Sequence, residues 1–214
     1  MTGKGPLQSG FYFVCKHLLR GSLAAYVRVR YFNVPDETVM RRGLLIVSNH
    51  QSFLDPVLVG SALPAPASYL ARRDLFRIPV LGQVIYALNS YPVTRGAVDS
   101  AALRNILRLL RSGETVLMFP EGTRSYDGAL GLFKPGAAAI AIRCGVPVLP
   151  ACVEGAYECW PRTQKLPRPG RVAVAYGKPL HPGAQSAEEL TRRVRTEIEG
   201  LQGFLRRYLG HTEG

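Results

Sequence analysis

Apolar residues fall along this chain in short runs separated by stretches with helical spacing. Four runs have the length of buried strands and are bounded by glycine or polar residues: 43–49, 115–120, 146–155 and 171–177. Between the first two runs, residues 100–112 carry apolar side chains on one side of a helix and arginines on the other. This stretch is therefore predicted to be an amphipathic helix that ends at Gly113.

The pattern predicts two more helices. Residues 137–144 are rich in alanine and end at Gly145, and residues 186–208 open with S-A-E-E, the pattern of a capping box. Strands separated by helices favour an α/β fold, here a single domain with a mostly parallel central sheet flanked by helices. In such sheets ligands bind beyond the carboxyl ends of the strands.

The N-terminal segment has a different composition. Residues 11–32, FYFVCKHLLRGSLAAYVRVRYF, mix aromatic and aliphatic residues with four lysine or arginine side chains. This composition predicts an amphipathic helix, which could lie in a lipid headgroup region or pack on the protein's own core. We therefore divide the chain into a segment 1–32, a candidate for the membrane interface, and a domain 33–214. No window contains about 18 to 20 uninterrupted apolar residues, so no membrane span is predicted.

The charge balance is strongly basic. The chain has 27 lysine and arginine residues against 15 aspartate and glutamate residues, a net charge of +12. Such a surface attracts polyanions, namely nucleic acid, anionic lipid headgroups or phosphorylated small molecules. No RNA-binding aromatic motif, zinc finger or DNA-reading helix is recognisable, so a non-catalytic basic binder of nucleic acid or of a membrane surface is the weaker hypothesis. The four cysteines lack C-x-x-C spacing, and no metal site is predicted.

Candidate catalytic residues stand just after the first predicted strand. His50 follows the run 43–49, and Asp55 comes five residues later. An aspartate at this distance can fold back to one imidazole nitrogen, fix its tautomer and support the imidazolium that forms when the other nitrogen takes a proton. The spacing alone is a weak signal, because a capping histidine, a metal ligand or an ordinary loop residue would look the same.

A second candidate stretch, F-P-E-G-T-R-S at 119–125, follows the second predicted strand. Gly122 would let the backbone approach a ligand closely, and Arg124 has the planar fork that suits phosphate. Glu121 could hold that arginine or accept a hydrogen bond from a substrate hydroxyl. The alternative is an ordinary turn with a surface ion pair.

The two candidate stretches are expected to meet in space. His50 and Glu121 each follow a predicted parallel strand, so both should emerge at the same sheet edge. Two other basic residues lie in loops, Arg95 before the arginine-bearing helix and Lys134 before the alanine-rich helix. Either could bind phosphate, and either could be only solvated.

The order of these motifs resembles that of the glycerolipid acyltransferases, the lysophosphatidic acid acyltransferases and their relatives. The first family motif, N-H-x-S-x-x-D, is matched in full at 49–55, and F-P-E-G-T-R-S is intact at 119–125. Another family motif, an arginine just before the central helix, resembles Y-P-V-T-R-G with Arg95, and the last motif, an apolar run with two prolines, resembles V-P-V-L-P at 146–150. The resemblance spans about residues 43–155.

The resemblance implies roles for individual residues. His50 would act as general base, with Asp55 as its orienting partner. The acceptor and its phosphate would be bound beside this pair, with Glu121 positioning the acceptor. The residues expected to contact the substrate are Arg95, Glu121, Gly122, Thr123, Arg124 and Lys134.

The activity that the resemblance implies is transfer of a fatty acyl group from acyl-CoA or acyl carrier protein to a hydroxyl of a lysophospholipid. The expected acceptor is 1-acylglycerol 3-phosphate, which would give phosphatidic acid; glycerol 3-phosphate, a lyso-ornithine lipid or another lysolipid are the alternatives. No metal or other cofactor is expected, since the acyl thioester is itself a substrate. The protein is expected to be a peripheral protein on the cytoplasmic face of the membrane, bound to an anionic surface, with no specific nucleic-acid partner.

Overall fold

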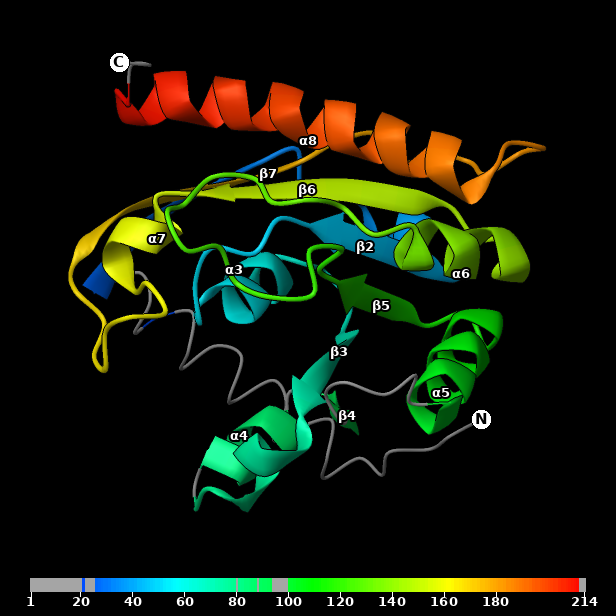
Figure 1. Ribbon diagram of the computed structural model, residues 1–214, viewed down its shortest axis with the longest axis horizontal. Coiled ribbons are helices and arrows are strands. Elements are labelled where there is room, and N and C mark those ends of the chain that lie inside the picture. Colours follow the sequence, from blue (N-terminus) through cyan, green and yellow to red (C-terminus); the bar gives the residue numbers. More distant parts are fainter. Residues whose placement is uncertain (1–20, 22–25, 80, 88, 94–99, 212–214) are drawn as a thin grey trace.

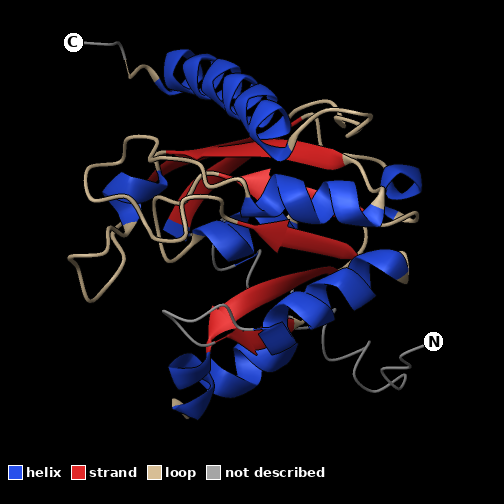
Figure 2. Cartoon of the chain, turned by 45° about the vertical axis from the view of Figure 1, so that its right-hand side comes forward, coloured by secondary structure: helices blue, strands red, loops and turns tan. Residues whose placement is uncertain are grey.

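The computed structural model describes residues 21, 26–79, 81–87, 89–93 and 100–211. This part of the chain forms one seven-stranded sheet with helices on both faces (Figure 1, Figure 2). The strands lie in the order β1-β7-β6-β2-β5-β3-β4. Their bounds are β1 Val27–Phe32, β2 Leu44–Ser48, β3 Ala67–Arg72, β4 Ser90–Val93, β5 Thr115–Met118, β6 Val148–Glu154 and β7 Gly170–Tyr176.

The sheet is mostly parallel, as predicted. Every pair of neighbouring described strands is parallel except β6 and β7, which are antiparallel. The strands β2, β5, β6 and β7 closely match the four predicted apolar runs. Because β7 is reversed and β1 is parallel to it, these two strands run opposite to the rest of the sheet.

Helices of the described part are α2 Glu37–Met40, α3 Asp55–Ser61, α4 Leu81–Ala87, α5 Ser100–Arg111, α6 Gly136–Cys144, α7 Ala156–Cys159 and α8 Ala187–Leu209, with a 3-10 turn η1 at Arg73–Arg77. The apolar periodicity predicts α5, α6 and α8 correctly. Ser186 and Glu189 form the predicted capping box of α8, because each side chain accepts the backbone N–H of the other, at 3.1 and 2.9 Å. Gly145 ends α6 in the left-handed region.

The central strand β2 is buried on both faces, so its side chains contribute to two cores. Leu45 and Val47 pack with residues of α5, α6 and α8, whereas Leu44 and Ile46 pack with residues of α3 and α7. This explains why β2 is an unbroken apolar run instead of an alternating one, as expected for a sheet covered on both sides.

The carboxyl ends of β2, β5 and β6 meet at one edge of the sheet, which we call the carboxyl edge. Their last residues are Ser48, Met118 and Glu154, and the register pairs Val47 with both Met118 and Pro150. The loops that follow these strands therefore lie close together. Sequence-distant residues of the two predicted motifs are brought to one place by this arrangement.

The helix predicted for 11–32 is wrong for its last part. Residues 27–32 form β1, which pairs with β7 along its whole length and so belongs to the sheet. Their sequence, V-R-V-R-Y-F, alternates with the period of a strand. Residues 11–20 and 22–25 lie outside the described part, so the interfacial role of 1–32 stays a prediction. No helix among the described residues is long and apolar enough to cross a membrane.

Gly43 offers a test of backbone packing just before β2. Its φ is +79°, and a Cβ there would meet the carbonyl oxygen of Leu110, whereas a Cβ on Gly145, with φ +66°, would meet nothing within 4 Å. Gly43→Ala should therefore lower the free energy of unfolding by about 3 kcal/mol or more, because strain and a steric clash add. Gly145→Ala should lower it by about 1 to 2 kcal/mol, from left-handed strain alone. Chemical denaturation measures both, and equal losses would contradict the clash.

Candidate active site

Asn49 fixes the point at which the chain leaves β2. Its side-chain amide donates to the backbone oxygen of Val153 at 2.9 Å, and its side-chain oxygen accepts the backbone N–H of the same residue at 2.8 Å. Asn49 is buried, and the two bonds continue the pairing of β2 with β6 beyond Ser48. His50 is therefore the first residue past this pairing, at the carboxyl edge.

The predicted contact between His50 and Asp55 is present. Asp55, the first residue of α3, is fully buried, and its Oδ2 lies 2.8 Å from His50 Nδ1. The same oxygen accepts the backbone N–H groups of Gln51 at 2.6 Å and of Ser52 at 2.7 Å. When Nδ1 carries the hydrogen that faces this carboxylate, Nε2 is the ring nitrogen that can accept a proton. The geometry suits a base and its orienting partner.

The imidazole ring is also held by stacking. Phe119, the first residue of the F-P-E-G-T-R-S motif, stacks on His50 with ring centroids 4.0 Å apart and an interplanar angle of 17°. The His50 side chain keeps 19% exposure, so a substrate hydroxyl can reach the ring from outside. Sequence reasoning did not assign a role to Phe119, although its place beside the motif was visible.

Glu121 joins the two motifs through the backbone. Its Oε1 accepts the backbone N–H of His50 at 2.9 Å, and its Oε2 accepts that of Gly131 at 3.2 Å. In return, the backbone N–H of Ser125 donates to the carbonyl oxygen of His50 at 2.7 Å. Glu121 is only 7% exposed, and this burial raises the pKa of its carboxyl group. Glu121 thus positions His50, and its expected contact with substrate stays a prediction.

The candidate phosphate ligands of the second motif lie around one turn. Gly122 has φ +71°, a left-handed conformation, and a Cβ there would lie 3.4 Å from the ammonium nitrogen of Lys134. Thr123 is exposed beside it. The guanidinium carbon of Arg124 lies 3.3 Å from the centre of the Phe53 ring. Gly122, Thr123 and Arg124 thus lie between Glu121 and Ser125, the two residues that bind the backbone of His50, and Lys134 lies beside Gly122. Arg95 lies outside the described residues.

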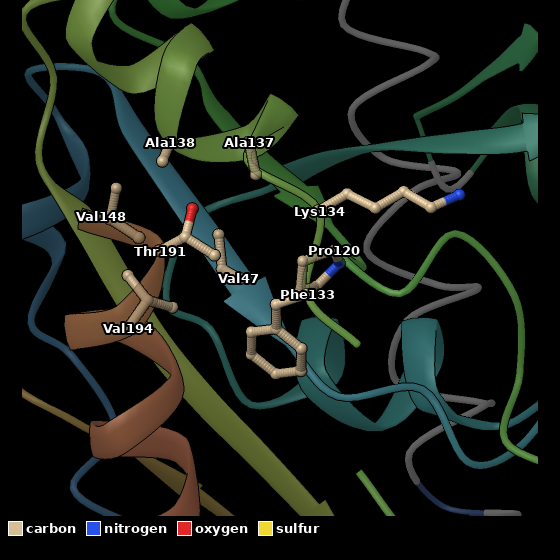
Figure 3. A pocket seen from close by; sticks show the side chains of 9 residues that line it. All are labelled: Val47, Pro120, Phe133, Lys134, Ala137, Ala138, Val148, Thr191 and Val194. Atoms are coloured by element: carbon tan, nitrogen blue, oxygen red, sulfur yellow. The ribbon is translucent and has the colours of Figure 1, made fainter. Parts of the chain in front are cut away.

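A small apolar recess lies behind the second motif, between the sheet and helices α6 and α8 (Figure 3). It is lined by Val47, Pro120, Phe133, Lys134, Ala137, Ala138, Val148, Thr191 and Val194. Neither His50 nor Asp55 lines it, and the side chain of Lys134 extends away from the apolar residues (Figure 3). We therefore assign the recess to the packing of α6 and α8 on the sheet and place the candidate active site outside it.

Comparison with known proteins decides the family. A family model described as Acyltransferase matches residues 30–154, which include His50, Asp55 and the whole stretch 119–125. The chain belongs to this Acyltransferase family. The resemblance seen in the motifs is thereby confirmed.

Similar curated proteins and a solved structure agree with this family assignment. The chain is 35% identical over 155 residues to 1-acyl-sn-glycerol-3-phosphate acyltransferase LPAT1, chloroplastic, of Arabidopsis thaliana, covering 71% of this chain and 43% of that protein. It is 28% identical over 199 residues to the 1-acyl-sn-glycerol-3-phosphate acyltransferase of Pseudomonas aeruginosa, covering 88% and 76%. The crystal structure of the 1-acyl-sn-glycerophosphate (LPA) acyltransferase PlsC from Thermotoga maritima is similar with a TM-score of 0.79 and 29% identity, covering 94% and 81%. The chain spans less than half the length of the chloroplast relatives it matches.

A buried polar network joins α8 to the first acyltransferase motif. The carboxylate of Glu154 accepts from the side chains of Gln51 at 3.3 Å, Gln202 at 2.9 Å and Arg206 at 3.3 Å. Gln51 also donates to the carbonyl oxygen of Gly128 at 2.7 Å. Helix α8 lies beyond the residues that the family model matches, yet it supports the turn that carries His50. Sequence reasoning missed this network, and its one local signal was a glutamine on the apolar face of α8.

Glu121 gives a pH-dependent prediction. Because burial raises its pKa above the usual value of 4.5, the folded protein binds this proton more tightly than the unfolded chain does. The contribution of Glu121 to stability therefore falls as the pH rises from 4.5 through the raised pKa. Glu121→Gln removes this dependence. The free energy of unfolding of the variant, relative to that of the wild type, should therefore increase as the pH rises across that window. Denaturation at several pH values measures the difference. Glu158→Gln, at an exposed position, is the control, and a constant difference for Glu121→Gln would contradict the prediction.

Proposed function

We propose that the protein is an O-acyltransferase that moves a fatty acyl group from an acyl thioester to the free hydroxyl of 1-acylglycerol 3-phosphate, giving phosphatidic acid. One observation carries this proposal: the His50–Asp55 pair is hydrogen-bonded, through the backbone of His50, into the F-P-E-G-T-R-S loop of a member of the Acyltransferase family. A general base therefore stands beside a turn suited to phosphate. The names of the bacterial and plant relatives favour the same acceptor.

The reaction begins with proton transfer to His50. Nε2 removes the proton from the acceptor hydroxyl as its oxygen attacks the thioester carbonyl, and Asp55 stabilises the imidazolium that forms. The tetrahedral intermediate then collapses, the carbon–sulfur bond breaks, and the imidazolium returns the proton to the departing thiolate. General base catalysis of this kind is worth about 10² to 10⁴-fold in rate. Acyl-CoA and acyl carrier protein both carry such a thioester, and no other cofactor is required.

The acceptor phosphate is proposed to bind at the turn of the second motif. Lys134 supplies an ammonium group beside Gly122, and Arg124 supplies a guanidinium two residues along. Arg95 and Thr123 complete the proposed set. Because the acceptor and the product are lipids, we place the protein at the cytoplasmic face of a membrane as a peripheral protein, with residues 1–32 as a candidate interfacial segment.

Replacing the base tests the proposed reaction. His50→Ala should reduce kcat for acyl transfer by at least about 10²-fold, because no other group would take the hydroxyl proton. Asp55→Asn should also reduce kcat strongly, since an amide cannot stabilise the imidazolium charge. Acyl transfer is measured with purified protein, and circular dichroism confirms that each variant is folded. A folded His50→Ala protein with wild-type activity would refute the proposal.

Lys134 tests the acceptor site. Lys134→Gln should raise KM for 1-acylglycerol 3-phosphate about tenfold and leave KM for the acyl donor unchanged, because a charge-assisted contact with phosphate is lost. Lys178→Gln, an exposed lysine that follows β7 at the other edge of the sheet, is the matched control and should change neither constant. The same assay on glycerol 3-phosphate and lyso-ornithine lipid ranks the alternative acceptors. Preference for a phosphate-free acceptor would overturn the phosphate-site assignment.

A further inference from the structure

The connection between β6 and β7 lies at the carboxyl edge, beside the candidate active site. β6 ends at Glu154 and the antiparallel β7 begins at Gly170, so the residues between them start and finish at this edge. Figure 1 shows this connection continuing past α7 and extending beyond the end of the sheet. We call residues 160–171 the basic segment.

The basic segment is fixed to the catalytic turn. Ser52 Oγ donates to the backbone oxygen of Trp160 at 2.8 Å, and Arg162 donates to the backbone oxygen of Arg124 at 3.5 Å. The guanidinium of Arg162 also lies 3.8 Å from the centre of the Tyr126 ring. A surface that docks on this segment is therefore held at a defined position relative to the catalytic turn.

The surface of the basic segment combines cations with exposed apolar side chains. Its sequence, WPRTQKLPRPGR, contains four basic residues and no acidic residue. Leu166 is 77% exposed near its middle, and Tyr126, on which Arg162 lies, is 71% exposed. Two exposed carboxylates lie close in the sequence to these residues: Asp127 follows Tyr126, and Glu158 comes two residues before Trp160. A leucine that faces water between cations fits a bilayer interface, where the apolar side chain leaves water and the cations contact lipid phosphates.

We propose that the basic segment docks on an anionic bilayer, with Leu166 entering the headgroup region and Lys165 and Arg168 contacting lipid phosphates. The carboxyl edge, with His50, then faces the membrane that holds the lysolipid acceptor. This inference rests on the proposed function, because an enzyme acting on lipids must bring its site to the bilayer. A nucleic acid would meet the same cations but would leave Leu166 without a role.

Two variants of the full chain test the docking surface. Lys165→Gln/Arg168→Gln should lower the affinity for vesicles of phosphatidylcholine and phosphatidylglycerol about 30-fold, because two cations near an anionic surface are lost. Leu166→Ser should lower it about tenfold. Vesicle sedimentation measures both. Arg162 is left unchanged, because it contacts the loop that carries Arg124.

The matched controls remove the same kinds of side chain, two cations or one exposed apolar residue, at other places on the surface. Arg104→Gln/Arg108→Gln changes the net charge equally on α5, which Figure 1 places at the opposite side of the sheet from α7. Val34→Ser removes an exposed apolar side chain after β1, at the opposite edge from the basic segment. Both controls should keep wild-type affinity for vesicles. Equal losses in the controls, or no loss in the Lys165/Arg168 and Leu166 variants, would overturn the proposal.

Activity separates this inference from the proposed function. With 1-acylglycerol 3-phosphate in vesicles, the Lys165/Arg168 variant should lose activity in parallel with binding, and with a short-chain acceptor dispersed below its critical micelle concentration it should match wild type. A wild-type protein that binds vesicles but transfers no acyl group to the dispersed acceptor would refute the function and leave the docking surface standing. If the substitutions weakened binding to duplex DNA and not to vesicles, the partner would be a nucleic acid and the proposal would be wrong.

Discussion

The buried carboxylate of Asp55 is the interaction on which the geometry of the site depends. One of its oxygens takes the hydrogen bonds of an imidazole nitrogen and of two backbone N–H groups, all within 2.8 Å. A carboxylate withdrawn from water is unfavourable unless such donors replace its hydration. Because two of the donors belong to the turn between His50 and α3, the turn that binds this oxygen of Asp55 also sets the direction of the imidazole.

The second motif reaches the same turn from a different strand. The backbone N–H of His50 donates to Glu121, and its carbonyl oxygen accepts from Ser125. Both backbone groups of His50 are therefore bound to a loop about seventy residues away in the sequence. The parallel arrangement of β2 and β5 makes this possible, since both loops leave the sheet at the same edge. Glu154, the last residue of β6, connects a third strand to this site. Through Gln202 and Arg206 it also connects helix α8.

Much of this arrangement could be predicted from the sequence. Long periodic helices and buried apolar runs gave α5, α6, α8 and the central strands, because burial on both faces leaves a strong pattern. The strands β3 and β4 left no such pattern: β4 is an edge strand of four residues that contains Pro92, and β3 mixes Ser68 and Arg72 with its apolar residues. The composition of 11–32 predicts a helix over β1 because arginines and aromatic residues suit an interfacial helix as well as they suit an edge strand.

The candidate catalytic residues of the site could be predicted from the sequence, but the long-range hydrogen bonds that hold them in place could not. The spacing of His50 and Asp55 predicted their contact, because a five-residue turn is a local event. The bond from Gln51 to Glu154 joins residues 103 positions apart, and nothing in the local sequence of either residue signals the other. Glu121 shows the same limit: its residue type suggested an arginine or a substrate hydroxyl, whereas the fold gives its oxygens the backbone N–H groups of His50 and Gly131.

The reversal of β7 and β1 decides where the chain enters the fold. Since β1 is parallel to β7, and β7 starts at the carboxyl edge, the residues that precede Val27 join the sheet at that edge and not at the opposite one. Tyr26 marks this entry, because its hydroxyl donates to the carbonyl oxygen of Pro167 in the basic segment at 2.9 Å. The chain thus enters the sheet at Tyr26, next to the surface that carries Leu166. Docking of the basic segment on a bilayer would bring this entry point of the chain to the same lipid leaflet.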